Sequence, residues 1–139
     1  MNRTFRTLFT AAAAAVLISA SAFAAGDDGK PIDLRSMSRT MAYATVYDMQ
    51  NNPDNYLGRT VRMSGSFTTF TAKPGGERCT ACIIKDAAAC CSAGMEFSLA
   101  EKPAKLPNED STINVEGIFA VEKEAGLAFT LLKNARFLP

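Results

Sequence analysis

Alternation of apolar and polar residues constrains the fold of this chain more than any other feature. Residues 61–67 and 113–121 each carry an apolar residue or a glycine at every second position. A period of two places these positions on one face of an extended strand, with polar residues on the other face. Both runs are therefore expected to be half-buried strands. Gly65 and Gly117 interrupt their apolar faces, as glycines do where a strand bends or bulges so that a sheet can curl.

A single helix is expected before these strands, over residues 39–51. Its apolar positions recur at helical spacing, and they are Ala42, Val46 and Met49. Ser36 or Ser38 can cap its N-terminus. Pro53 ends the helix, because proline disfavours the helical conformation in the residue before it.

Three further strands are expected at residues 79–85, 95–99 and 127–132, the last extended over 135–138. Glycine-containing turns precede the first and last of them, at residues 73–76 and 122–126. One helix followed by five short strands predicts a mainly β domain, folded as a small closed or nearly closed barrel.

The first 24 residues have the pattern of a secretory signal peptide. A basic start with Arg3 and Arg6 precedes an apolar stretch over residues 8–18, and small residues lead to Ala22-Phe23-Ala24. This pattern matches the A-x-A cleavage rule and predicts a mature chain that begins at Ala25. The apolar stretch is too short to span a bilayer and no later segment is long enough, so no membrane insertion is expected. We expect a periplasmic or secreted protein with a flexible leader over residues 25–35 and one domain over residues 36–139.

Charge argues against a nucleic-acid partner. Removal of Arg3 and Arg6 with the signal leaves 13 basic against 14 acidic residues, which changes the formal net charge from +1 to −1. No run of five or six basic residues remains to neutralise phosphates. Nucleic-acid binding is therefore not expected.

Two segments carry a resemblance to a known class of proteins. Residues 52–61 read Asn-Pro-Asp-Asn-Tyr-Leu-Gly-Arg-Thr-Val, and residues 81–97 contain an adjacent cysteine pair followed by Gly94-Met95-Glu96-Phe97. The first resembles the entry from a helix into the first strand of small bacterial secreted OB-fold proteins, and the second resembles a double-cysteine loop in some of them. The resemblance implies an OB-like five-stranded barrel with an N-terminal helix. It implies no particular ligand, because OB barrels host many unrelated functions.

All of the cysteines in the chain lie within thirteen residues, and they are Cys79, Cys82, Cys90 and Cys91. The chain has no histidine, so a metal-binding or reactive centre is expected to be built from these sulfurs. Four thiolates are the tetrahedral ligand set that zinc prefers, and soft thiolates also suit Cu(I). The second pair is adjacent, whereas a zinc ribbon has a second Cys-x2-Cys. Adjacent side chains diverge, which strains a site for a single metal ion.

The same four cysteines are also candidates for two structural disulfides. An oxidising compartment, an even count and closeness within a hairpin favour this alternative. A Cys90–Cys91 bond is the least expected pairing, because it closes a strained ring. A redox-active Cys79–Cys82 pair is the weakest interpretation, since residues three apart on a strand face opposite sides.

Other candidate ligands are weaker. Asp86 and Glu96 flank the cysteines as oxygen ligands, although solvation of a loop is enough to account for both. Most methionines are expected to fill the core, with Met41, Met49 and Met63 on apolar faces and Met37 and Met95 less constrained. Three tyrosines are expected to pack against the barrel, and they are Tyr43, Tyr47 and Tyr56. No nucleophile motif or carboxylate pair indicates catalysis, so no enzymatic activity is expected.

Together these features predict a periplasmic accessory or binding protein that holds a soft or borderline metal ion, zinc or copper, through its cysteine cluster. The alternative is a disulfide-stabilised interaction module that binds a peptide or a glycan. Its partner would be an envelope protein or a small ligand that the sequence does not identify.

Overall fold

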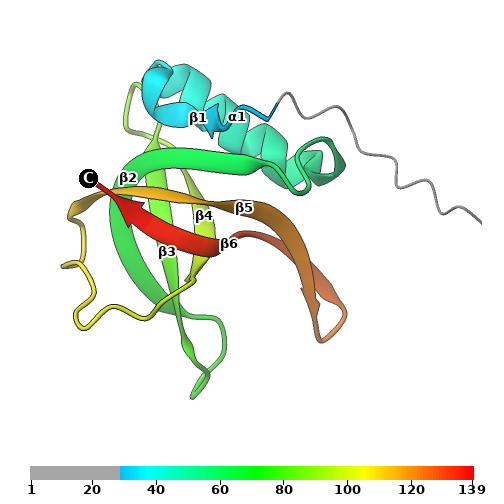
Figure 1. Ribbon diagram of the computed structural model, residues 1–139, viewed down its shortest axis with the longest axis vertical. Coiled ribbons are helices and arrows are strands. Elements are labelled where there is room, and N and C mark those ends of the chain that lie inside the picture. Colours follow the sequence, from blue (N-terminus) through cyan, green and yellow to red (C-terminus); the bar gives the residue numbers. More distant parts are fainter. Residues whose placement is uncertain (1–28) are drawn as a thin grey trace, which may run out of the picture.

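The computed structural model describes residues 29–139, which form one helix, two short 3-10 helices and six strands (Figure 1). The elements in chain order are β1 Ile32–Asp33, η1 Leu34–Ser36, α1 Arg39–Asn51, η2 Pro53–Asn55, β2 Thr60–Thr71, β3 Arg78–Lys85, β4 Ser92–Leu99, β5 Thr112–Glu124 and β6 Leu127–Leu138. The expected helix and five strands are all present, and the fold class is mainly β as predicted. The signal peptide, its cleavage site and the first residues of the leader lie outside the described residues.

The strands form a single sheet whose pairings close into a ring. β2 pairs with β3, β3 with β4, β4 with β6, β6 with β5, and β5 again with β2. The β4–β6 pairing is parallel and the other four are antiparallel. β2 closes the ring because it is long enough to change partner, with Ser66 opposite Ile83 of β3 and also opposite Thr112 of β5.

The two interior glycines lie where the strands bend, as the sequence predicts. Gly65 precedes the residue at which β2 changes partner, and a Cβ there would lie 2.3 Å from the carbonyl oxygen of Ile83. Gly117 lies at a register shift between β5 and β6, where a Cβ would lie 2.8 Å from Cβ of Leu132. Any larger residue would separate backbones that touch at these points.

The ring encloses a core that α1 covers at one end (Figure 1). Ser38 caps α1 by accepting the N–H of Met41, and the expected stripe of Ala42, Val46 and Met49 is buried. The largest fully buried side chains come from α1 and every strand of the ring: Phe67, Phe97, Phe119, Met49, Met63, Met95, Leu132, Val46, Val61, Val115 and Cys82. The apolar side chains that alternate along β2 and β5 therefore point inward as expected.

Several side chains differ from expectation. Met41 is 58% exposed, whereas Met95 is only 1% exposed and belongs to the core. Tyr43 and Tyr56 pack against the core as expected, but Tyr47 is 57% exposed. Met41 and Tyr47 lie on the face of α1 away from the sheet, which the narrow buried stripe leaves uncovered.

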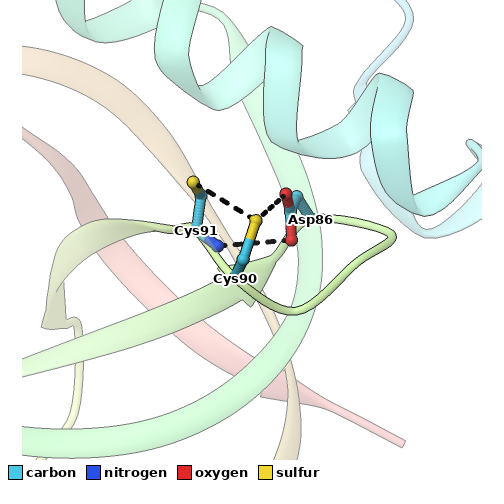
Figure 2. A group of neighbouring side chains, drawn as sticks. All are labelled: Asp86, Cys90 and Cys91. Carbon is cyan, nitrogen blue, oxygen red and sulfur yellow. Dashed lines mark hydrogen bonds between the residues drawn. The ribbon is translucent and has the colours of Figure 1, made fainter.

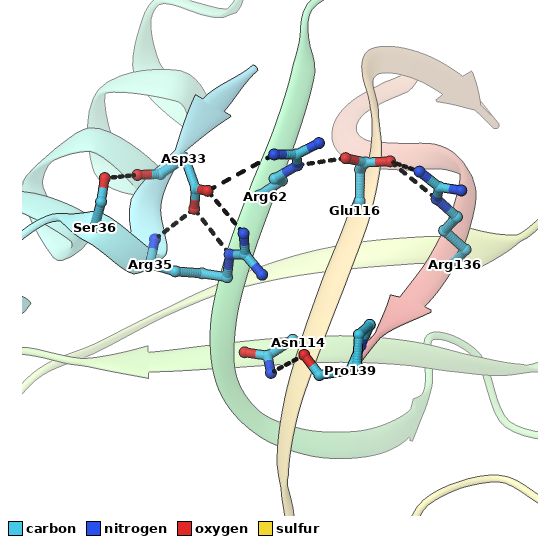
Figure 3. Close-up of polar contacts among 8 residues, drawn as sticks. All are labelled: Asp33, Arg35, Ser36, Arg62, Asn114, Glu116, Arg136 and Pro139. Atoms are coloured by element: carbon cyan, nitrogen blue, oxygen red, sulfur yellow. Dashed lines mark hydrogen bonds and ion pairs between the residues drawn. The ribbon is translucent and has the colours of Figure 1, made fainter. Parts of the chain in front are cut away.

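Residues 32–35 are ordered, although the sequence places them in a flexible leader. Ile32 and Asp33 pair in parallel with Val61 and Arg62 of β2, and Leu34 is 2% exposed. A chain of ion pairs runs from this segment across the sheet, in the order Arg35, Asp33, Arg62, Glu116 and Arg136 (Figure 3). Strand pairing of Ile32 and Asp33, together with these ion pairs, holds the segment in place. Its polar composition gives no strand pattern in the sequence.

No helix among residues 29–139 is long and apolar enough to cross a membrane.

Candidate metal site on the β3–β4 turn

The turn between β3 and β4 is organised by the carboxylate and backbone of Asp86. The backbone N–H of Asp86 donates to the carbonyl of Cys91 at 3.0 Å, and the N–H of Ala89 donates to the carbonyl of Asp86 at 3.1 Å. The side chain closes the same turn, because Oδ1 accepts the N–H of Cys91 at 3.3 Å. These bonds tie both ends of the turn to Asp86.

Ala89 gives the turn its sharp reversal. Its φ is +56°, in the left-handed region that side chains other than glycine rarely adopt. Residue 90 therefore starts in a new direction just before β4 begins at Ser92. The two adjacent cysteines lie in this reversal, and the divergence expected of adjacent side chains does not keep their sulfurs apart.

The Cys90 sulfur lies between the Asp86 carboxylate and the Cys91 sulfur (Figure 2). The Sγ atoms of Cys90 and Cys91 are 3.7 Å apart, and Sγ of Cys90 lies 3.3 Å from Oδ2 of Asp86. One ligand atom from each of the three residues falls within 4.8 Å of the others. Cys90 and Cys91 are exposed and Asp86 is half-buried, so an ion can reach the group from solvent.

The Asp86 carboxylate disfavours ionisation of the Cys90 thiol. The hydrogen bond to Asp86 and the neighbouring Cys91 raise the pKa of the Cys90 thiol to about 11. The Cys90 thiol in turn lowers the pKa of the Asp86 carboxyl. Burial raises the pKa of the nearby Tyr43 phenol, and Cys91 and Asp86 add to this effect. A bound cation would offset the negative charge of Asp86 and of a Cys90 thiolate, and it would have to displace the Cys90 proton.

Cys82 is not part of this group. It is completely buried, opposite Phe67 and Met95 in the neighbouring strands. Burial raises the pKa of its thiol to about 12, so it stays protonated and behaves as a small apolar side chain.

Cys79 lies three residues earlier on β3 and so on the opposite face of the sheet from Cys82. It lines a different cavity, together with Glu96. Burial raises the pKa of its thiol, and Glu96 raises it further. The structure therefore brings together two of the four predicted metal ligands, and all four cysteines are free thiols.

Asp86 supplies the third candidate ligand, which sequence reasoning named but set aside as a solvated loop residue. The Asp-x3-Cys-Cys spacing is the sequence signal for this ligand. In a tight turn, residues four or five positions apart come close together, so the carboxylate lies near the two cysteines. Glu96, the other flanking carboxylate, faces away into the cavity with Cys79.

That cavity is a cleft of about 460 Å³ between the tips of the β2–β3 and β5–β6 hairpins. Its lining is mostly apolar and includes Phe70, Leu127 and Phe129. Lys73 and Glu124 join the two hairpins through an ion pair of 2.5 Å. Both hairpin tips point away from α1 (Figure 1).

No family model, curated protein or solved structure matches the chain. Function must therefore be inferred from these two sites.

Proposed function

We propose that this protein is an exported, non-catalytic accessory protein that binds a metal ion at Asp86, Cys90 and Cys91. The N-terminal signal pattern supports the periplasmic or secreted location. The order of pairings in the ring supports an OB-like barrel as the scaffold, because β2 pairs with β5 and β4 runs parallel to β6. This assignment narrows the expected four-cysteine site to two cysteines and one carboxylate.

The spacing of the ligand atoms is the observation that carries this proposal. Two thiolates at about 2.3 Å from a tetrahedral zinc ion lie about 3.8 Å from each other, and a thiolate and a carboxylate oxygen lie about 3.5 Å apart. The corresponding separations in the turn are 3.7 Å and 3.3 Å. Sγ of Cys91 lies within 4.8 Å of a carboxylate oxygen of Asp86, so rotation of the exposed side chains would bring all three atoms to one zinc ion, and water can fill the fourth position.

The same spacing favours zinc over copper. A linear two-thiolate complex with a similar bond length needs sulfurs about 4.6 Å apart, which is wider than the turn provides. The hard oxygen of Asp86 also suits zinc better than Cu(I), which prefers sulfur ligands. Zinc is therefore the ion whose coordination geometry this group of ligands fits better.

Titration of zinc and Cu(I) into the reduced protein, with free thiols counted first, tests this proposal. Zinc should bind once per chain, release protons and raise the melting temperature. A Cys90→Ser, Cys91→Ser double variant should lose the effect, whereas Cys79→Ser should keep it. Zinc stabilisation that survives the double variant, or that depends on Cys79, would show that the ion binds elsewhere.

The apolar cleft supports a second role as a peptide-binding module. Phe70 is 41% exposed and Leu127 is 75% exposed, although both are large apolar side chains on strands. Exposed apolar residues beside a preformed cleft favour a ligand with apolar side chains over a glycan, which needs more polar partners. The four cysteines are unpaired in the structure, so this second role does not depend on disulfide staples.

Binding of extended apolar peptides, followed by NMR shifts of backbone amides, tests the second role. Shifts should gather on the two hairpins and weaken in a Leu127→Ser variant. The exposed Leu57 lies outside the cleft and provides a control variant, Leu57→Ser. If only oligosaccharides induced shifts, the ligand would be a glycan and not a peptide. If the shifts lay outside the hairpins, this cleft would not be the binding site.

A further inference from the structure

The adjacent sulfurs of Cys90 and Cys91 can react with each other as well as bind a metal. They lie 3.7 Å apart on an exposed turn, and no other cysteine among residues 29–139 shares their cluster. We propose that Cys90 and Cys91 form a reversible vicinal disulfide that switches off the metal site. The switching part of this inference rests on the proposed zinc function, but formation of the bond does not.

Geometry makes Cys90 and Cys91 the reactive pair. A disulfide has an S–S length of about 2.05 Å, so rotation of two exposed side chains must shorten the present separation by less than 2 Å. Cys82 is sealed in the core, and Cys79 lies on the outer face of the sheet with its sulfur 3.9 Å from the carbonyl of Glu77. Cys90 and Cys91 are therefore the pair that can meet without unfolding of a strand.

Strain in the product makes the bond easy to reverse. Two adjacent cysteines close an eight-membered ring that restricts the peptide between them, and the turn already contains Ala89 at φ +56°. Strained and exposed disulfides are more easily reduced than structural ones. The property that makes this pair a poor staple thus makes it suitable as a switch.

The reaction needs a disulfide oxidant, either a small-molecule disulfide or an oxidised thiol–disulfide exchange protein. The thiolate of one cysteine attacks the oxidant, forms a mixed disulfide and expels one thiolate. The second cysteine then attacks the protein sulfur of the mixed disulfide and expels the other. The two protein thiols lose two protons and two electrons in total, and the oxidant takes up both and becomes two thiols.

Oxidation removes the ligands on which zinc depends. Sulfurs in a disulfide carry no negative charge, and only Asp86 would remain as an anionic ligand. Bound zinc should conversely protect both cysteines, because it holds the thiolates that would attack the oxidant. Metal binding and disulfide formation are therefore mutually exclusive.

Treatment of the reduced, zinc-free protein with glutathione disulfide, followed by tryptic digestion and mass spectrometry, tests this inference. Cleavage after Arg78 and Lys85 separates the peptide with Cys79 and Cys82 from the peptide with Cys90 and Cys91. The second peptide should lose two hydrogens, carry no glutathione and recover its mass with dithiothreitol. The single variants Cys90→Ser and Cys91→Ser should instead retain one glutathione on the remaining cysteine, and Cys79→Ser should behave like the natural chain.

A stable glutathione adduct on Cys90 or Cys91 of the natural chain, an unmodified peptide, or a link to Cys79 would overturn the inference. A zinc titration of the reduced and oxidised forms separates this failure from failure of the proposed function. If the vicinal bond forms but reduced protein ignores zinc, the zinc function is wrong and the disulfide stands. If zinc binds but no bond forms, the switch is wrong, and equal zinc binding by both forms would also refute it.

Discussion

The carboxylate of Asp86 accepts a hydrogen bond from the thiol of Cys90, four residues later in the same turn, with 3.3 Å between Oδ2 and Sγ. This contact couples the ionisation of the two groups, since the pKa of the thiol is raised to about 11 and the pKa of the carboxyl is lowered. At neutral pH the pair therefore holds one proton on sulfur and one negative charge on oxygen. A metal ion that replaces this proton gains both a thiolate and a carboxylate ligand.

Replacement of Asp86 by asparagine should make Cys90 more reactive. Without the carboxylate, the pKa of Cys90 should fall from about 11 toward its usual value of 9.0, which raises the thiolate fraction at pH 8 by about tenfold or more. Iodoacetamide labelling of the tryptic peptide should accelerate accordingly, while zinc affinity falls. The exposed Glu101, outside the turn, offers the control Glu101→Gln; equal labelling rates in Asp86→Asn and the natural chain would refute the coupling.

The Gly65 close contact predicts a large loss of stability in Gly65→Ala. The new Cβ would meet backbone oxygen of Ile83 at 2.3 Å, so the strands must move apart at a cost of about 1–3 kcal/mol or more. Gly94→Ala is a matched control in β4, because the one short contact of its Cβ would be with the flexible end of the Ile83 side chain at 2.5 Å. Urea unfolding should rank Gly65→Ala well below Gly94→Ala, and the reverse order would contradict the packing described here.

Phe119 and Ile118 are neighbours on β5 with opposite environments. Phe119 is fully buried and meets Tyr56 edge to face, whereas Ile118 is 40% exposed. Phe119→Ala should lower the free energy of unfolding by about 3–5 kcal/mol. Ile118→Ala should cost much less, and similar losses in both variants would mean that β5 is not in this register.

Glu116 should make the fold sensitive to acid. Arg62 and then Arg136 lower the pKa of its carboxyl, against the opposing effect of burial. A lowered pKa gives stability that is fully present above the usual value of 4.5 and is lost as pH falls through the folded value. Glu116→Gln should weaken the protein above pH 4.5 by about 1–3 kcal/mol and flatten the change in stability below it. Parallel stability curves for the variant and the natural chain would contradict this.

The helix and the inward faces of β2 and β5 follow directly from the sequence. Their signals are local: a cap at Ser38, a helical stripe ended by Pro53, and alternation through Val61 and Phe119. Tertiary packing did not need to override any of them. The strand pairings confirm a ring of hydrogen bonds. That this ring is an OB-like barrel stays a prediction.

β1 could not be predicted because its signal is not local. Two residues give no alternation, and the strand exists because Ile32 and Asp33 meet Val61 and Arg62 from a distant part of the chain. Leu34 is buried for the same reason. The ion pairs of Asp33 also depend on strand neighbours that sequence spacing does not reveal.

The candidate site was predicted only in part. Strand periodicity places Cys79 and Cys82 on opposite faces of the sheet, which rules out a shared metal ion as well as a redox pair. The reversal at Ala89 brings Cys90, Cys91 and Asp86 together, and a positive φ at alanine has no sequence signature. A turn geometry therefore decided which of the predicted ligands can share an ion.

X-ray absorption at the zinc edge of the reduced, zinc-loaded protein tests the central claim most directly. The account predicts two sulfur ligands at about 2.3 Å and the remaining ligands oxygen at about 2.0–2.2 Å. Cys79→Ser should leave that spectrum unchanged, and Asp86→Asn should change only its oxygen component. Four sulfur ligands, or none, would contradict the assignment of zinc to Asp86, Cys90 and Cys91.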